Sequence, residues 1–131
     1  MNATAYLKSG PRFPSGNCTK MKSSKKNIIA KVLNPLDSIA YGKNAVVSST
    51  IIKKQAGTVT LFSFDRGQGL SEHTAPFDAL ICIIEGRARI YIAKKPYTVS
   101  KGEIIILPAN KPHSLKAISK FKMMLVMIKS S

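Results

Sequence analysis

The chain has 131 residues, which suits one domain and leaves little room for a second. Apolar residues make up 44% of it, enough for a packed core, yet no apolar run is long enough to span a bilayer. The 21 Lys and Arg residues against 6 Asp and Glu residues give a net charge of +15. Two cysteines form no disulfide framework, and the N-terminus shows no apolar signal region, so we expect a reducing, cytoplasmic location.

The positive charge favours contact with nucleic acid or another polyanion. The basic residues are nevertheless scattered over many segments, and the sequence contains no pattern for a recognition helix or an aromatic stacking platform. We therefore interpret most of them as a lysine-rich solvated surface. Polyanion or nucleic-acid binding driven by charge remains an alternative.

The first 26 residues are rich in Ser, Gly, Pro, Asn and Lys and carry no hydrophobic period. This composition is typical of a flexible basic arm. Residues 28–41 allow either a short strand or a helical turn. We accordingly divide the chain into an arm, residues 1–26, and a folded domain, residues 27–131.

From Val46 onward the pattern predicts β-strands. The candidate segments are short, rich in Ile, Val and Thr, and separated by glycines and Lys-Pro pairs. They are 46–53, 58–64, 79–85, 87–93, 97–99, 103–107, 114–118 and 121–128. About eight close-spaced strands with no long helical pattern between them indicate an all-β sandwich or barrel.

The segment 79–84 is apolar on both faces, as is 104–107. In a single barrel only one face of each strand points inward. If Ile81 and Ile83 face the interior, then Leu80, Cys82 and Ile84 point outward. A partner subunit or the N-terminal segment must cover that second apolar face, and we expect a homodimer.

Two histidines stand at matching places in two spaced motifs. The first motif begins at Gly67 and ends at Gly86, and the second begins at Gly102 and ends at Ala117. Their internal positions hold His73, Ala75 and Ala79 in the first, and Pro108, Asn110 and His113 in the second. The spacing resembles G-x5-H-x-H-x3-4-E-x6-G and G-x5-P-x-G-x2-H-x3-N, the two motifs of the cupin superfamily.

The resemblance implies a single-domain, RmlC-like cupin jelly-roll barrel whose characteristic core covers about residues 45–128. It further implies that alternate strand residues point into a cavity, lined by His73, Ala75, Ala79, Ile81 and His113. In cupins that bind a metal, the two motifs supply three His and one Glu.

The departures from the motif matter for the chemistry. His73 and His113 occupy ligand positions and could hold a divalent metal such as Zn, Fe, Mn or Ni. Ala75 and Ala79 occupy the other two positions and have no donor atom. Zinc and iron catalytic sites generally use three protein ligands. Asp78 is the weak candidate for the missing carboxylate, since it reaches inward only if the backbone bends.

Three interpretations of the histidine pair stay open. In the first, the two residues are neutral, hydrogen-bonded pocket residues with no metal. They can also line a pocket that holds a small molecule or anion, with weak or no metal. In the third interpretation they serve a metal-dependent enzyme of the dioxygenase or isomerase type. The sequence favours small-molecule or anion binding and leaves catalytic activity undecided.

Overall fold

The computed structural model describes residues 28–129, which form nine strands and one 3-10 turn. In chain order these elements are η1 (Pro35–Asp37), β1 (Val46–Lys54), β2 (Gly57–Phe64), β3 (Gly69–His73), β4 (Asp78–Glu85), β5 (Arg87–Ile92), β6 (Lys95–Ser100), β7 (Ile104–Leu107), β8 (His113–Ala117) and β9 (Phe121–Ile128).

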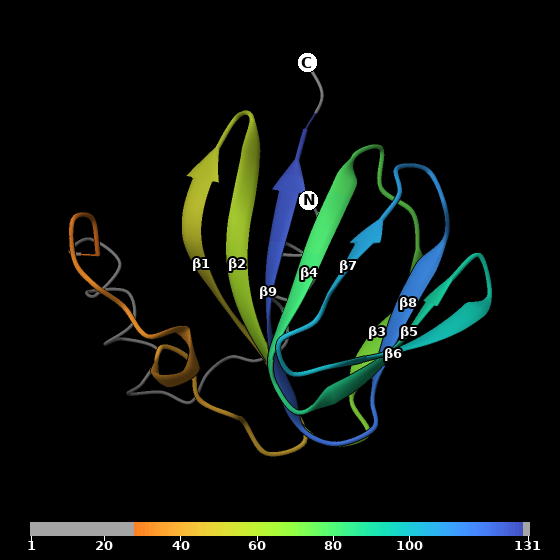
Figure 1. The fold of residues 1–131 in the computed structure, drawn as a ribbon, viewed down its shortest axis with the longest axis horizontal. Helices are drawn as coiled ribbons and strands as arrows, with labels where there is room; N and C mark the ends of the chain where they lie inside the picture. Colours follow the sequence, from red (N-terminus) through yellow and green to blue (C-terminus); the bar gives the residue numbers. More distant parts are fainter. Residues whose placement is uncertain (1–27, 130–131) are drawn as a thin grey trace.

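Two antiparallel sheets face each other (Figure 1). The first sheet has the strand order β1-β2-β9-β4-β7 and the second has the order β3-β8-β5-β6. Chain neighbours such as β3 and β4 lie in different sheets, so the chain crosses repeatedly from one layer to the other. This arrangement is a jelly roll, and it confirms the predicted all-β class.

The inner faces of the two sheets form one apolar core. Phe62, Phe64 and Phe121 are fully buried in it, and the rings of Phe64 and Phe121 stack with centroids 4.5 Å apart. Burying each of these side chains contributes roughly 2 kcal/mol to folding. Ile81 and Ile83 are each 1% exposed, as the alternation along β4 predicts.

The structure corrects the sequence prediction at one strand. Strand β3 was not expected from the sequence. Only one of its five residues, Leu70, is large, apolar and buried. The two glycines before and at the start of this strand have different roles. Gly67 does turn the chain, with φ at +84°, but Gly69 begins β3, and a Cβ there would collide with the carbonyl oxygen of Leu115 on β8. The close approach of two strands explains this second glycine.

Residues 34–41 form a strap across the outer face of the first sheet. The strap begins with η1, capped by the Asn34 side chain, which accepts a hydrogen bond of 3.0 Å from Leu36 N. Ile39 is 4% exposed and packs with Val47 and Leu61. The helical-turn alternative for this part of the chain is therefore the correct one.

A lysine from β9 holds the strap against the first sheet through a hydrogen bond. Lys122 is 8% exposed, and its Nζ donates a 2.7 Å hydrogen bond to the carbonyl oxygen of Leu36. Tyr41, at the end of the strap, donates a hydrogen bond to Glu85. Ile84 packs against the Ile39 cluster, so the chain itself covers one end of the outward apolar face.

The predicted arm, residues 1–26, lies outside the described residues, and so does residue 27 at the proposed domain boundary. Within the described part of the chain, no helix is long and apolar enough to cross a membrane. The cytoplasmic location stays a prediction.

Candidate functional site

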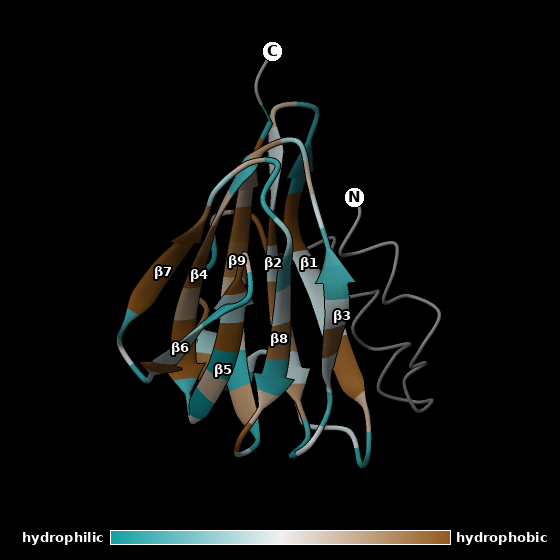
Figure 2. Ribbon diagram, turned by 90° about the vertical axis from the view of Figure 1, so that its right-hand side faces the viewer, coloured by the Kyte–Doolittle hydropathy of each residue, from teal (hydrophilic) through white to brown (hydrophobic). Residues whose placement is uncertain are grey.

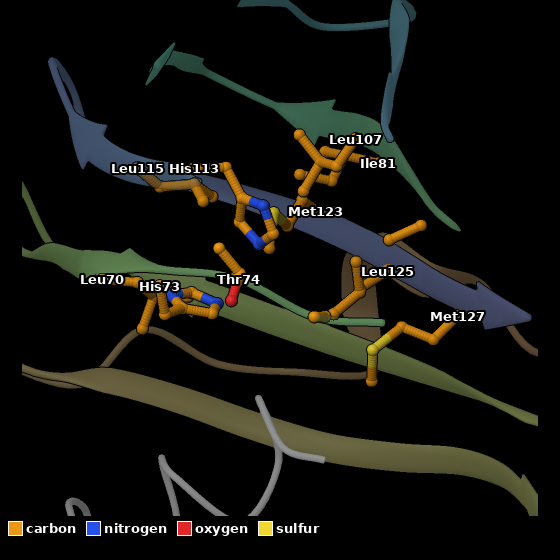
Figure 3. A pocket seen from close by; sticks show the side chains of 12 residues that line it. Leu70, His73, Thr74, Ile81, Leu107, His113, Leu115, Met123, Leu125 and Met127 are labelled. Atoms are coloured by element: carbon orange, nitrogen blue, oxygen red, sulfur yellow. The ribbon is translucent and has the colours of Figure 1, made fainter. Parts of the chain in front are cut away.

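A small cavity of about 50 Å³ lies between the two sheets (Figure 3). Its walls are apolar except for two imidazoles and one hydroxyl. They are formed by Leu70, His73, Thr74, Ala75, Ala79, Ile81, Leu107, His113, Leu115, Met123, Leu125 and Met127. All five residues that the sequence assigned to a cavity are among them.

His73 belongs to the first motif and His113 to the second, and the two side chains face each other. They occupy paired positions at adjoining ends of the antiparallel strands β3 and β8. Their ring centroids are 4.5 Å apart and their planes meet at 72°. Figure 3 shows the His113 ring pointing toward His73 and Thr74. The two halves of the sequence motif thus converge on one end of the cavity.

Backbone carbonyls orient both imidazole rings. Nδ1 of His73 lies 2.7 Å from the carbonyl oxygen of Ser71, and Nδ1 of His113 lies 3.1 Å from that of Lys111. A carbonyl oxygen can only accept, so each Nδ1 carries the proton. In the neutral ring the lone pair then resides on Nε2, which is an acceptor or a metal ligand.

The environment keeps His113 neutral. Burial, together with repulsion from the neighbouring His73, lowers the pKa of His113 below its ordinary value of 6.5. The hydrogen bond to Lys111 opposes this effect but does not overcome it. At neutral pH the His113 ring therefore presents a hydrogen-bond acceptor rather than a positive charge.

The carboxylates closest in sequence to the motif positions, Asp78 and Glu72, have partners outside this cavity. Asp78 Oδ1 accepts a 2.8 Å hydrogen bond from Ala109 N in the loop between β7 and β8. Glu72 makes a long, exposed ion pair of 3.5 Å with Lys94. Neither residue lines the cavity, so the weak expectation that Asp78 would reach inward is not met.

The cavity residues do not provide the set of ligands with which the cupin motifs bind a metal. Ala75 and Ala79 both line the cavity, at the positions where a metal-binding cupin would supply His and Glu. Among residues 28–129, no three His, Cys, Asp or Glu side chains are grouped so that they could hold an ion. Two imidazoles alone fall short of the three protein ligands of a catalytic zinc or iron site.

Sequence reasoning missed much of the apolar wall. The cavity residues predicted from the sequence include none of β9. In the structure Met123, Leu125 and Met127 share the inward face of β9 and line the cavity, whereas Met124 belongs to the outer cluster around Ile39. The alternation along β9 was the available signal.

Comparisons with known proteins agree with this geometry. The family model described as a cupin domain matches residues 60–129. A conserved protein of unknown function from Streptococcus pyogenes is 36% identical, with a TM-score of 0.75 over 78% of this chain and 90% of that one. The chain therefore belongs to the cupin domain family.

Two further solved structures support the assignment. A cupin 2 conserved barrel domain protein from Leptotrichia buccalis is 36% identical, with a TM-score of 0.70 over 72% of this chain and 46% of that one. A cupin superfamily protein from Desulfitobacterium hafniense is 26% identical, with a TM-score of 0.74 over 79% of this chain and 96% of that one. No curated protein sequence gave a significant match.

Proposed function

We propose that the cavity binds a small molecule that has a short apolar body and a hydrogen-bond donor at one end. The observation that carries this proposal is the neutral His113 ring, oriented by Lys111, at one end of an otherwise apolar cavity. Pockets of this kind obtain affinity from apolar contact and orientation from a few fixed polar groups.

The size of the cavity limits the ligand. Its volume of about 50 Å³ exceeds what one water requires and is roughly a third of the size of a cavity that holds benzene. The enclosed part of the ligand therefore consists of a few heavy atoms. Met123 and Met127 have flexible thioether side chains, which can adjust to branched aliphatic shapes.

The protonation of His73 and His113 indicates which polar group the ligand carries. An Nε2 lone pair accepts a hydrogen bond from an O–H or N–H group, and a lone pair repels an anion. A ligand bearing an alcohol or amide therefore fits better than a carboxylate while His113 is neutral. A metal-dependent oxygenase or isomerase activity is not part of this proposal, because the cavity provides too few ligands.

Saturation-transfer NMR with 2-methyl-1-propanol tests the proposal, and its methyl ether serves as the matched probe without a donor. We expect the alcohol to bind about fivefold more tightly, since one neutral hydrogen bond contributes about 1 kcal/mol. Ala75→Leu should fill the cavity and remove binding of both probes. His113→Leu should remove only the preference for the alcohol.

Ser114→Leu is the control for these variants, because Ser114 adjoins His113 on β8 and pairs with Tyr91 on the outer face. It should leave both affinities unchanged. Undiminished binding of the alcohol to Ala75→Leu would place the probe elsewhere on the protein and refute the proposal.

A second candidate function is electrostatic attraction of a polyanion. Arg89 and Lys116 stand directly opposite each other on β5 and β8, an arrangement that destabilises a sheet when both charges are unneutralised. Within residues 28–129 the single ion pair is that of Lys94 and Glu72. An anionic partner on this outer face would relieve the repulsion.

Fluorescence titration with a single-stranded oligothymidylate of about 15 nucleotides tests this candidate. The logarithm of the affinity should fall linearly with the logarithm of the salt concentration. Replacing Arg89 and Lys116 by Gln should reduce the slope by about two. Replacing Lys53 and Lys54 by Gln, an equal change of charge on β1, should leave the slope nearly unchanged. Equal effects of the two pairs would show diffuse attraction and overturn the candidate.

A further inference from the structure

Strand β2 carries two buried hydroxyl groups on its inner face. Thr58 is 7% exposed and Thr60 is 0% exposed, and neither Oγ1 has a hydrogen-bond partner within the described residues. Phe62, two residues further along the strand, belongs to the core between the sheets, so the alternation of β2 places both threonines on the same inward face. Buried hydroxyls in folded proteins nearly always have a partner. Two neighbouring exceptions on one face therefore indicate that a polar group binds there.

The strand register places these threonines next to the wall of the cavity. Thr58 pairs with Met127 on β9, and Thr60 pairs with Leu125. Both partners line the cavity. Residues directly opposite each other on antiparallel strands have Cβ atoms about 5 Å apart. The two hydroxyls therefore lie one strand beyond the cavity, next to the side chains that form its wall.

The threonines also lie at the histidine end of the barrel. Thr58 stands in one row across the first sheet with Ala79, with β9 between them. Asp78, the neighbour of Ala79, binds Ala109 N in the loop that leads into β8 and His113. Figure 2, in which the second sheet lies in front of the first, shows β8 across from β2. The threonine hydroxyls and the His113 ring thus belong to facing strands at one end of the molecule.

We propose, on the basis of the ligand binding proposed above, that Thr58 and Thr60 form a second polar subsite of the cavity and that the ligand is a short aliphatic diol. One hydroxyl of the diol donates to Nε2 of His113, and the other binds the two threonines. A threonine hydroxyl can donate and accept. An alcohol does the same, so it satisfies both threonines, whereas an ether only accepts.

Met127 separates the cavity from the subsite. Its side chain is unbranched and has several rotatable bonds, so a change of rotamer joins the two spaces without moving the backbone. Strands β2 and β4 are two strand spacings apart, about 10 Å. Since the side chains on both strands project into this gap, a diol of about four carbons is long enough to reach from Ala79 to Thr58.

A pair of probes of equal size tests the subsite. 1,4-Butanediol and 1-pentanol have equally many heavy atoms and differ at one end, hydroxyl against methyl. The methyl signal of Met127 reports the binding of either probe. Thr58→Val with Thr60→Val keeps the shape of both side chains and removes their hydroxyls. This double substitution should weaken binding of the diol about tenfold and should not weaken binding of 1-pentanol.

Thr98→Val is the matched control for this variant. Thr98 is an exposed threonine of β6, where its neighbour Val99 is buried, so its side chain lies on the outer side of the second sheet. The substitution makes the same chemical change within a strand but away from the cavity. Both affinities should equal those of the unmodified chain.

Intermolecular NOEs in the unmodified chain locate the diol without any substitution. The methylene protons of 1,4-butanediol should give NOEs to the methyl groups of Thr58, Thr60 and Met127. They should give none to the methyl group of Thr98. This measurement decides the question even if the double variant fails to fold.

Three results would overturn the diol subsite. Equal effects of the double substitution on both probes, or no effect on either, would show that the hydroxyls do not recognise the second alcohol group. NOEs to Leu125 without NOEs to Thr58 or Thr60 would show that the diol stays in the cavity. In both cases the ligand proposed for the cavity would stand. If neither probe binds the unmodified chain, the proposed function fails and the subsite fails with it.

Discussion

The imidazoles of His73 and His113 meet edge to face, 4.5 Å between ring centroids, at paired positions of β3 and β8. Backbone carbonyls hold both Nδ1–H groups, so the tautomer that suits a metal ligand is fixed even though two ligand positions are alanine. The chain thus retains two of the four ligand positions of the cupin motifs, and both lie at one end of a small apolar cavity.

Restoring the two missing ligands should create a metal site. Ala75 and Ala79 line the same cavity as the histidine pair, so Ala75→His with Ala79→Glu would supply four donors. We expect the zinc affinity to rise at least a hundredfold over the unmodified protein, measured by competition with a chromophoric chelator. Tight, stoichiometric zinc binding by the unmodified protein would contradict our interpretation of the site.

The depressed pKa of His113 should make the protein less stable in mild acid. Since its folded-state pKa lies below 6.5, the unfolded chain binds more protons, and stability falls as the pH drops from about 6.5 toward the folded pKa. Above pH 6.5 this contribution is fully present. Urea unfolding at several pH values gives the free energy of unfolding as a function of pH. His113→Gln should reduce the slope of this dependence below pH 6.5. An unchanged slope would mean that His113 titrates normally in the folded state.

A buried hydroxyl in β2 should be dispensable. Thr60 is 0% exposed, and its Oγ1 has no hydrogen-bond partner within the described residues. Thr60→Val keeps the shape and removes the unsatisfied group, so we expect the free energy of unfolding to rise by about 1 kcal/mol. Denaturant unfolding provides the measurement. A loss of stability would reveal a water or ligand that holds this hydroxyl.

Lys122, which holds the strap, should contribute more to stability than Lys120, which lies near the same tyrosine. Lys122→Met removes the partly buried hydrogen bond to Leu36 and should lower the free energy of unfolding by about 2 kcal/mol. Lys120 lies at a similar distance from the Tyr41 ring, 4.7 Å against 4.9 Å, but is exposed. Lys120→Met is therefore the control, and equal losses for the two variants would refute the role of the hydrogen bond.

The sequence predicted the barrel and the convergence of its motifs better than the details of the site. Motif spacing was enough to place His73 and His113 together, because strand register follows from alternation and turn positions. Strand β3 was missed, since it lacks a periodic apolar pattern. The strap was missed for a different reason: it depends on contacts between segments distant in the chain, which no local pattern records. The cavity wall on β9 was within reach of the sequence, because Met123, Leu125 and Met127 alternate along that strand.

The central claim is that the cavity beside the histidine pair takes a small ligand, and methionine methyl NMR tests it most directly. Met123 and Met127 line the cavity, whereas their neighbour Met124 faces the outer cluster. Titration with 2-methyl-1-propanol should shift the methyl signals of Met123 and Met127 saturably. We expect a dissociation constant of about 1 mM, equivalent to about 0.8 kcal/mol per heavy atom. The signal of Met124 should stay in place. Unsaturable shifts of equal size in all three signals, or no shift at all, would contradict the account.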